Sequence, residues 1–366
     1  MYLKTAQIKN FRNIKEASLC FCPNVNVILG KNAQGKTNLL EAIWLLSGNK
    51  SFRGASDREF TSFDESNFYI GASFCDSDEE FKLSIGCDTS SDKPIKKIMR
   101  GEKKYATQKA LLGAVPMTVF SPDDLELIKA GPINRRNYCD SLLCMLFPAF
   151  AKTLSRYNRI VSQKNALLRE ENGADNIEIW NEQLSLFGAS VVKSRIELLK
   201  RLREPAGTYF YEMASEELKL EYSCSFCENA DIEEDELYKA LLKKLSENKE
   251  KEINAGACLY GPHRDDIEVI INKKSARQFA SQGQQRSAVL ALLLAKTQLL
   301  KNHTGKTPIV LLDDVMSELD EGRQRYLLEK IDEFQVFITC CQGELFSSKK
   351  NTTFLVSGGK IVKKEE

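Results

Sequence analysis

The octapeptide GKNAQGKT at residues 30–37 decides the fold of this chain. It matches the pattern G-x-x-x-x-G-K-[ST], the apolar run 26–29 precedes it, and an amphipathic stretch from residue 36 to 46 follows it. Strand, glycine loop and helix in this order predict a loop whose backbone N–H groups face a phosphate at the start of a helix. A plain glycine turn before a helix would not require the lysine and the threonine.

The residues of this loop have separate expected tasks. We expect Lys36 to reach the β- and γ-phosphates of a nucleotide and the Thr37 hydroxyl to bind Mg²⁺. The rest of the loop would surround the phosphates, and its residues are Gly30, Lys31, Asn32, Ala33, Gln34 and Gly35. The expected ligands are therefore ATP and Mg²⁺.

A second motif lies near the other end of the 366-residue chain. The apolar run 309–312 ends in Asp313 and Asp314, and the carboxyl end of a buried strand is where α/β sheets place ligand-binding groups. We expect Asp313 to take part in Mg²⁺ binding and Asp314 to polarise the attacking water. The alternative is that the two aspartates only cap the next helix.

The wide separation of the two motifs predicts an α/β fold in which one sheet is built from both chain ends. We expect an ABC/SMC-type ATPase lobe from residues 1–121 and 256–366, with a mainly helical lobe, residues 122–255, inserted between them. Helical periodicity covers 138–168, 177–202 and 236–252. Breakers at 171–176, at Pro205 and in the acidic stretch 228–236 indicate a compact insert, not a long coiled arm.

Beyond residue 256 the pattern returns to α/β character. Strands are expected at 267–271, 309–312 and 335–339, helices at 282–300 and 317–334, and a terminal hairpin turning at Gly358 and Gly359.

The segment ASQGQ at residues 280–284 predicts an exposed helix start. Ser281 followed three residues later by Gln284 is a capping-box pattern, and Gly283 leaves room for a phosphate at the first turn. By itself the pattern also fits an ordinary capped core helix. Upstream of the Asp313 strand and with a distant phosphate loop, it indicates a second anion site.

Bulk composition limits the partners. Lysine and arginine number 52 against 51 acidic residues, so a net charge of +1 gives no overall attraction to nucleic acid or membrane. Any contact with a polyanion must be a local patch. Eleven scattered cysteines indicate reduced thiols, and no stretch of eighteen apolar residues occurs, so we expect a cytoplasmic protein without a membrane partner.

Weaker features keep two interpretations each. His263, in GPHRDD, is expected in a structural turn, with catalysis as the alternative. Cys224 and Cys227 form a lone CxxC without the flanking coiled coil that would present a shared zinc site. The basic residues named as DNA contacts, with solvated surface charge as the alternative, are Lys50, Arg53, Arg58, Arg135 and Arg136.

Taken together, these residues resemble an SMC-type ABC ATPase. Residues 30–37 resemble the Walker A motif, 280–284 the ABC signature, 311–314 the Walker B motif and 317–320 the D-loop. Within that group the chain resembles the bacterial RecF family, through KSFRG at 50–54, FSPDDL at 120–125, GPHRDD at 261–266 and SQGQQRS at 281–287. Their order and spacing cover nearly the whole chain.

The resemblance implies a dimer in which each ATP lies between the Walker motifs of one copy and the signature of the other. It implies a weak ATPase that depends on the dimer and on DNA, and binding of DNA at junctions between single and double strands. It further implies loading of recombinase in replication and repair, together with the mediator proteins RecO and RecR. Arg12, in the stretch KNFR, would touch the nucleotide phosphates.

The chain departs from the wider ABC pattern at three places. Gln282 replaces the second-position glycine of the signature, Asp314 stands where many ABC enzymes have glutamate, and Cys340 and Cys341 stand where a switch histidine would be expected. An ATPase motor of another ABC-type complex is the alternative function, and a metabolic P-loop kinase is a third class. Stimulation of ATP hydrolysis by DNA, and not by a small acceptor molecule, would distinguish a DNA-repair ATPase from a metabolic kinase.

Overall fold

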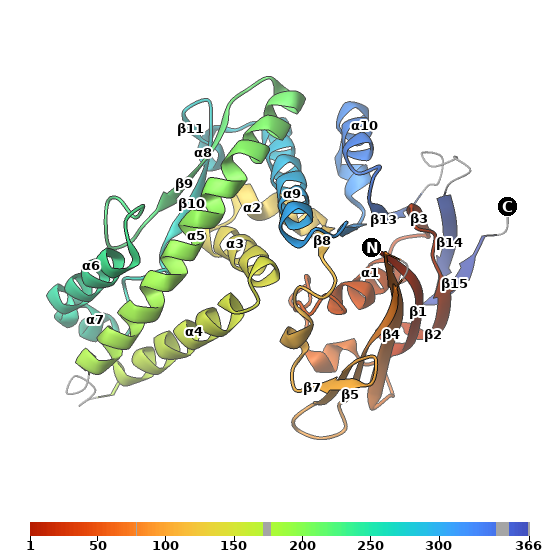
Figure 1. The fold of residues 1–366 in the computed structure, drawn as a ribbon, viewed down its shortest axis with the longest axis horizontal. Coiled ribbons are helices and arrows are strands. Elements are labelled where there is room, and N and C mark those ends of the chain that lie inside the picture. Colours follow the sequence, from red (N-terminus) through yellow and green to blue (C-terminus); the bar gives the residue numbers. More distant parts are fainter. Residues whose placement is uncertain (78, 171–176, 342–350, 365–366) are drawn as a thin grey trace. The chain divides into compact units, whose positions relative to one another are not determined.

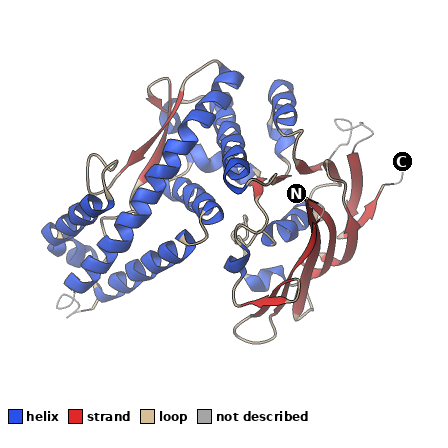
Figure 2. Ribbon diagram, viewed as in Figure 1, coloured by secondary structure: helices blue, strands red, loops and turns tan. Residues whose placement is uncertain are grey.

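The computed structural model describes residues 1–77, 79–170, 177–341 and 351–364. The chain divides into two compact units: unit 1, residues 1–124 and 296–366, and unit 2, residues 125–295 (Figure 1). Unit 1 contains the strand-rich part and unit 2 most of the helices (Figure 2). We expected residues 256–295 in the ATPase lobe, but in the structure they belong to unit 2.

A mainly parallel sheet forms the core of unit 1. Its strands are β3 (Val25–Leu29), β8 (Met117–Phe120), β12 (Ile309–Leu312), β13 (Gln335–Cys340), β14 (Asn351–Ser357) and β15 (Lys360–Lys363). The order is β15-β14-β3-β13-β12-β8, and only β15 runs antiparallel to its neighbour. All residues of β12 and β13 are buried, as expected of parallel strands covered on both faces. Both chain ends therefore build one sheet, as the sequence predicted.

An antiparallel sheet completes unit 1. It contains β1 (Tyr2–Phe11), β2 (Ile14–Cys20), β4 (Asn67–Asp76), β5 (Glu79–Asp88), β6 (Ile95–Arg100) and β7 (Lys103–Tyr105), in the order β2-β1-β4-β5-β6-β7. Its helices are α1 (Lys36–Leu45) and α10 (Glu321–Lys330), with short 3₁₀ turns η1 (Asp57–Phe60), η2 (Gln108–Leu111), η3 (Pro122–Leu125) and η5 (Val315–Glu318). In α1 eight of the ten residues are buried, which fixes the helix that follows the phosphate loop.

Unit 2 is helical around a small sheet. Its helices are α2 (Glu126–Lys129), α3 (Pro132–Leu146), α4 (Phe150–Leu167), α5 (Ile177–Ala214), α6 (Glu234–Glu247), α7 (Lys249–Ala255) and α8 (Ala276–Phe279). Helix α9 (Gln282–Thr304) belongs to unit 2 as far as Ala295. Strands β9 (Leu218–Ser223), β10 (Asp266–Ile271) and β11 (Lys274–Ser275) pair antiparallel in the order β11-β10-β9. Because β10 pairs with β9 of the predicted insert, the chain remains in unit 2 after residue 256.

Several predicted helix bounds were wrong. The helix expected over 138–168 is two helices, because the residue before Pro148 is disfavoured in the α region, and Phe147 has φ −130° and ψ 85°. The helix expected at 317–334 is η5 followed by the shorter α10. Pro205 does not interrupt α5, since the fully buried Leu202, Ala206 and Phe210 continue one apolar face past it. The predicted breaker at 171–176 lies outside the described residues.

Candidate nucleotide-binding site

The phosphate loop joins β3 to α1, and its two end glycines are required by space. Gly35 caps α1 with φ +113°, and a Cβ there would lie 2.6 Å from Oδ1 of Asn13. A Cβ on Gly30 would lie 2.5 Å from the carbonyl oxygen of Val356. A side chain at Gly30 would therefore displace the backbone of Val356, whereas Gly35 is favoured by its positive φ, which other residues rarely adopt.

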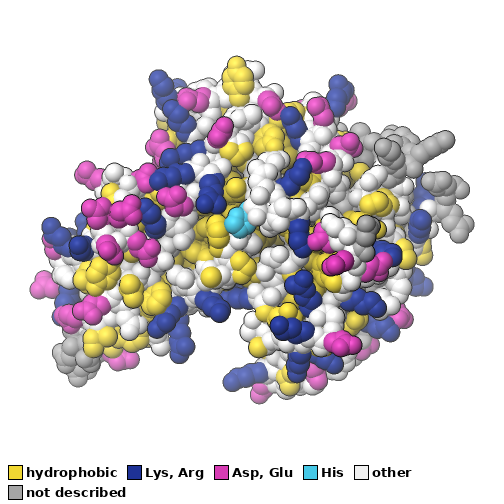
Figure 3. Space-filling model, in the orientation of Figure 1, with side chains coloured by type: hydrophobic (Ala, Val, Ile, Leu, Met, Phe, Trp, Pro, Cys, Tyr) yellow, Lys and Arg dark blue, Asp and Glu magenta, His cyan; other side chains and the backbone are white. Residues whose placement is uncertain are grey.

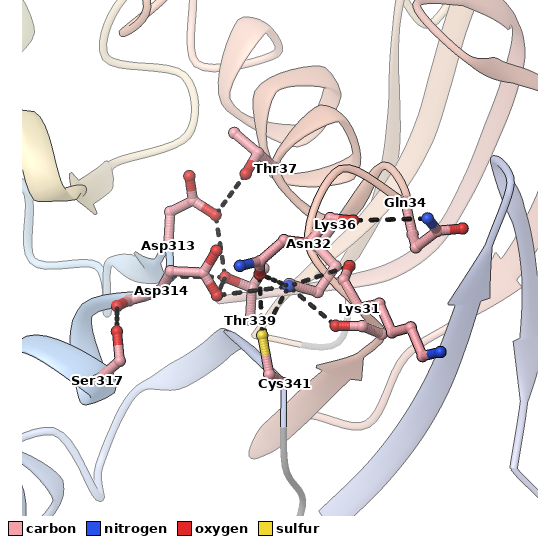
Figure 4. Close-up of polar contacts among 11 residues, drawn as sticks. Lys31, Asn32, Gln34, Lys36, Thr37, Asp313, Asp314, Ser317, Thr339 and Cys341 are labelled. Atoms are coloured by element: carbon pink, nitrogen blue, oxygen red, sulfur yellow. Dashed lines mark hydrogen bonds and ion pairs between the residues drawn. The ribbon is translucent and has the colours of Figure 1, made fainter.

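Lys36 points into the curve of the loop (Figure 4). Its Nζ donates to the carbonyl oxygen of Gly30 at 2.9 Å, and lies 3.5 Å from Oδ1 of Asn32 and 3.5 Å from Sγ of Cys341. Oδ1 of Asp314 is 3.6 Å away. The Lys36 side chain is only 3% exposed, and its charge lies beside the position expected for the phosphates.

Asp313 is the buried carboxylate of this site. Its Oδ1 accepts hydrogen bonds from Oγ1 of Thr37 and of Thr339, each at 2.9 Å, so residues from three separate parts of the chain meet at one oxygen (Figure 4). Burial raises the pKa of Asp313 above its usual range. A cation beside it would offset that burial, and a hydroxyl with a carboxylate are oxygen ligands of the kind that Mg²⁺ takes beside nucleotide phosphates. The residues present therefore fit ATP with Mg²⁺.

Asp314 has a different environment from Asp313. Its backbone is left-handed with φ +50°, its N–H donates to Oγ1 of Thr339 at 2.7 Å, and its side chain is 34% exposed. Ser317 donates to its carbonyl oxygen at 2.7 Å. This geometry turns the carboxylate toward Lys36, while the role of Asp314 in polarising water stays a prediction.

Glu41 was missed by the sequence reading. It lies one turn after Thr37 on α1, its side chain is fully buried, and its carboxylate accepts from Nε and Nη2 of Arg12 at 3.0 and 3.2 Å. Arg53 lies 3.9 Å from it and Ser51 also donates to it. The available signal was a single carboxylate inside the apolar run LLEAIWLL. Arg12, predicted to touch the phosphates, is thus bound to α1 through the Glu41 carboxylate.

The terminal hairpin also contacts the phosphate loop, which no motif indicated. The N–H of Gly358 donates to Oε1 of Gln34 at 2.7 Å and the N–H of Gly359 donates to the Gln34 carbonyl oxygen at 3.0 Å. Nδ2 of Asn13 donates to the same carbonyl at 3.0 Å. Two segments at opposite ends of the chain therefore fix one side of the loop.

The predicted signature segment lies in unit 2 and has the expected cap. The N–H of Ser281 donates to Oε1 of Gln284 at 2.8 Å, and the N–H of Gln284 donates to Oγ of Ser281 at 3.2 Å, which confirms the capping box. Nε2 of Gln284 also donates to Oε2 of Glu216 at 2.6 Å. Ser281 and Gln282 are exposed and Gly283 is partly buried. Their role toward ATP stays a prediction.

The GPHRDD segment forms a buried network in unit 2. Nδ1 of His263 lies 2.6 Å from the Tyr157 hydroxyl, and burial lowers the pKa of His263 to about 4. Asp265 accepts from the Tyr222 hydroxyl at 2.6 Å and from the N–H of Ser225 at 2.8 Å. These contacts support the structural interpretation of His263, since its partly buried ring is bonded to Tyr157 and to the carbonyl oxygen of Cys258.

Two of the predicted DNA contacts were wrong as surface cations. Arg135 is 5% exposed and binds both oxygens of Asp266, at 2.8 and 2.9 Å. Arg136 is partly buried and donates to the carbonyl oxygen of Asp265 at 2.6 Å. Both hold the turn before β10. Lys50, Arg53 and Arg58 are exposed in unit 1.

Other sequence predictions concern thiols, metals and membranes. All eleven cysteines are free thiols, and Cys224 and Cys227 are in contact. Among the described residues there is no group of three or more His, Cys, Asp or Glu side chains arranged for a metal ion. None of the helices described is long and apolar enough to cross a membrane.

Comparisons with known proteins agree with this geometry. The family model "RecF/RecN/SMC N terminal domain" matches residues 2–361. "DNA replication and repair protein RecF" of Thermoanaerobacter pseudethanolicus is 37% identical over 99% of this chain and 100% of the relative. The protein of the same description from Clostridium botulinum (strain Kyoto / Type A2) is 38% identical over 99% of each chain.

Solved structures give the same result. "Structure of the recombination mediator protein RecF-ATPrS in RecFOR pathway" is similar with a TM-score of 0.93 and 36% identity, covering 99% of this chain and 98% of that one. An Smc head domain from Pyrococcus furiosus, bound to the C-terminal domain of ScpA, has a TM-score of 0.57 at 14% identity, covering 99% of this chain and 96% of that one, which shows a shared fold alone. The chain therefore belongs to the RecF family of DNA replication and repair proteins, within the RecF/RecN/SMC group of ATPases.

Proposed function

We propose that this protein is an ATP-dependent recombination mediator that dimerises around ATP, binds DNA at single-strand gaps and helps to load recombinase. The observation that carries the proposal is the convergence of Thr37 and Asp313, from opposite ends of the chain, on one hydrogen bond of 2.9 Å beside the buried Lys36. Relatives named as recombination mediators of the RecFOR pathway support it, as do their solved structures with ATP. RecO and RecR are the proposed partner proteins.

ATP and Mg²⁺ are assigned to named residues in this proposal. The backbone of residues 30–37 binds the phosphates and Lys36 neutralises their charge. Thr37 and Asp313 hold Mg²⁺, which when bound supplies positive charge to the phosphoryl group being transferred. Asp314 orients the attacking water. Its side chain is one methylene shorter than glutamate, which supports a weak hydrolysis rate.

Dimerisation is proposed through the signature segment. Ser281, Gly283 and Gln284 open a helix whose first turn is exposed, and an exposed helix start attracts phosphate. We propose that it faces the ATP bound by a second copy. Hydrolysis and DNA binding then depend on the pair, because one copy alone lacks half of each site.

DNA binding is proposed for Lys50, Arg53 and Arg58 of unit 1. On the face shown in Figure 3, Lys and Arg side chains are interspersed with Asp and Glu, in keeping with the net charge of +1. A single copy therefore has few uncompensated cations for a polyanion. Pairing two copies doubles the set, and each neutralised phosphate contributes roughly 0.9 to the log–log salt slope on duplex DNA.

Two variants separate the steps of this proposal. Asp314→Asn is expected to bind ATP and dimerise but to lose hydrolysis by roughly 10²–10⁴-fold, the range for general base groups. Ser281→Arg is expected to bind ATP as a monomer and to fail to dimerise, because the long side chain fills the phosphate position. Light scattering with ATP and a hydrolysis assay measure both. A Ser281→Arg protein that still dimerised with ATP would remove the signature from the mechanism.

DNA binding is tested by a salt titration of affinity with and without a non-hydrolysed ATP analogue. The proposal predicts tighter binding and a salt slope about twice as steep with the analogue. Substituting Lys50 or Arg53 by Ala should weaken binding without changing ATP affinity. Equal slopes in both states would contradict ATP-gated binding.

A further inference from the structure

Two thiols are in contact in the loop between β9 and α6 of unit 2. Sγ of Cys224 and Sγ of Cys227 lie 3.3 Å apart, joined by an S–H···S hydrogen bond. Both side chains are partly exposed. The pair is therefore close enough to react internally and open to a small reagent.

The loop that carries the pair is anchored. The N–H of Ser225 donates to Oδ1 of Asp265 at 2.8 Å, and Oγ of Ser225 accepts from the N–H of Gly261 at 2.9 Å. Phe226 is 7% exposed. Since Ser225 is held by the GPHRDD segment and Phe226 is buried, the proximity of the sulfurs belongs to the folded unit.

The Cys227 thiol differs in acidity from the buried cysteines of the chain. Burial raises the pKa of Cys87, Cys258 and Cys340 to about 11, which disfavours their thiolates. The hydrogen bond between the two sulfurs instead lowers the pKa of Cys227 and raises that of Cys224, because one sulfur keeps the proton while the other becomes the thiolate. Cys227 is thus the better nucleophile and Cys224 the thiol that remains protonated beside it.

We propose that Cys224 and Cys227 form a reversible redox site that closes to an internal disulfide when it meets a low-molecular-weight disulfide such as oxidised glutathione. The Cys227 thiolate attacks one glutathione sulfur, an S–S bond to glutathione forms, and one glutathione thiolate leaves. Cys224 then loses its proton and attacks the Cys227 sulfur, which releases the second glutathione thiolate. The protein loses two electrons and two protons, and the small disulfide is reduced to two thiols.

The test uses the full chain in buffers of graded reduced-to-oxidised glutathione ratio. Free thiols are blocked by alkylation, and digested peptides are weighed by mass spectrometry. The expected result is a peptide two hydrogens lighter that links Cys224 to Cys227, restored by excess reduced glutathione. Cys340 and Cys341 are the matched control, because they are adjacent in sequence but one is buried and the other exposed.

The expected order of oxidation is quantitative. The 224–227 disulfide should be half formed in one buffer, and any disulfide of Cys340 with Cys341 in another. The first buffer should be at least about tenfold more reducing than the second, a difference of about 30 mV. A Cys224→Ser variant should retain glutathione on Cys227, and a Cys227→Ser variant should react more slowly at Cys224. Circular dichroism checks that both variants are folded.

Two outcomes would overturn the proposal. One is glutathione that stays on wild-type Cys227 without closing to Cys224. The other is a first disulfide elsewhere in the chain, with Cys224 and Cys227 still free thiols and therefore both recovered in alkylated form. ATP binding plays no part in the assay, so the result is independent of the proposed recombination function.

Discussion

The phosphate-loop cluster of unit 1 and the GPHRDD cluster of unit 2 are both dense in charge, but they use it differently. In the GPHRDD cluster, defined as residues 261–266 with Arg135, Tyr157 and Tyr222, the charged side chains have strong internal partners, such as both oxygens of Asp266 for Arg135. In the phosphate-loop cluster, defined as residues 30–37 with Asp313 and Asp314, Lys36 makes mostly longer contacts of 3.5–3.6 Å. A charged motif whose bonding capacity is filled holds the fold, whereas one with spare capacity is suited to a ligand.

The largest expected effect is on the saturated side of the comparison. Arg195 contacts the GPHRDD cluster, because its Nη1 donates to the carbonyl oxygen of Pro262 at 2.6 Å. It is 3% exposed and binds both oxygens of Asp140 at 2.8 Å. Arg195→Met leaves the Asp140 carboxylate, whose side chain is only 13% exposed, without its partner, so we expect the free energy of unfolding to fall by about 3–5 kcal/mol. Urea unfolding measures it. Lys200→Met on the same helix is the control, because its ion pairs are exposed and its loss should be far smaller.

The next effect is on the ligand side. Lys36→Ala removes the charge directed at the phosphates, so we expect ATP affinity to fall at least about a hundredfold, or about 2.7 kcal/mol. Lys31→Ala is the control, since Lys31 is exposed in the same loop and should change affinity less than about threefold. Titration calorimetry compares them. Equal ATP affinity in Lys36→Ala and the wild type would reject the assignment of the loop.

Glu41 lies in unit 1, but its carboxylate has filled partners like the charged groups of the GPHRDD cluster. It therefore tests whether filled partners, and not the location in unit 2, determine the contribution to stability. Glu41→Gln removes a buried, charge-assisted pair with Arg12, and we expect unfolding stability to fall by about 1.5–3 kcal/mol. The control is Glu59→Gln, whose carboxylate is exposed and accepts from Ser56. A Glu41→Gln protein as stable as the wild type would show that the filled partners do not set stability here.

The smallest effect is a pH slope from His263. Its folded pKa of about 4 lies below the value of about 6.5 for an unfolded histidine, so its contribution is complete above pH 6.5 and is lost as pH falls toward 4. Between pH 6.5 and 4 the wild type should therefore lose up to about 1.4 kcal/mol of stability per pH unit through His263. The His263→Gln variant should lack this loss. The difference between the two proteins isolates it, because Asp265 and Asp313 have raised pKa values and contribute with opposite sign. Parallel stability curves would contradict a buried neutral imidazole.

Local patterns predicted the parts of this molecule that local chemistry governs. The phosphate loop, the capping box at Ser281 and strands such as β3 and β12 follow from spacing, glycine and apolar runs, and the structure contains them. Failures occurred where packing outweighs propensity. Pro205 lies inside α5 because its neighbours are buried. Arg135 was wrongly predicted as a surface cation because its partner, Asp266, is 131 residues away in sequence and no local pattern indicates the pair.

The sequence by itself determined that a phosphate loop and a pair of aspartates exist, that one sheet needs both chain ends, and which family the chain resembles. Those features depend on residue type, on the short spacing inside each motif and on the long separation between the motifs. Only the tertiary structure decided which polar groups pair with one another: Glu41 with Arg12, Asp266 with Arg135, and the N–H of Gly358 with Gln34. Such pairings join residues far apart in the chain, and they are set by burial, which penalises an unpaired charge wherever its partner comes from.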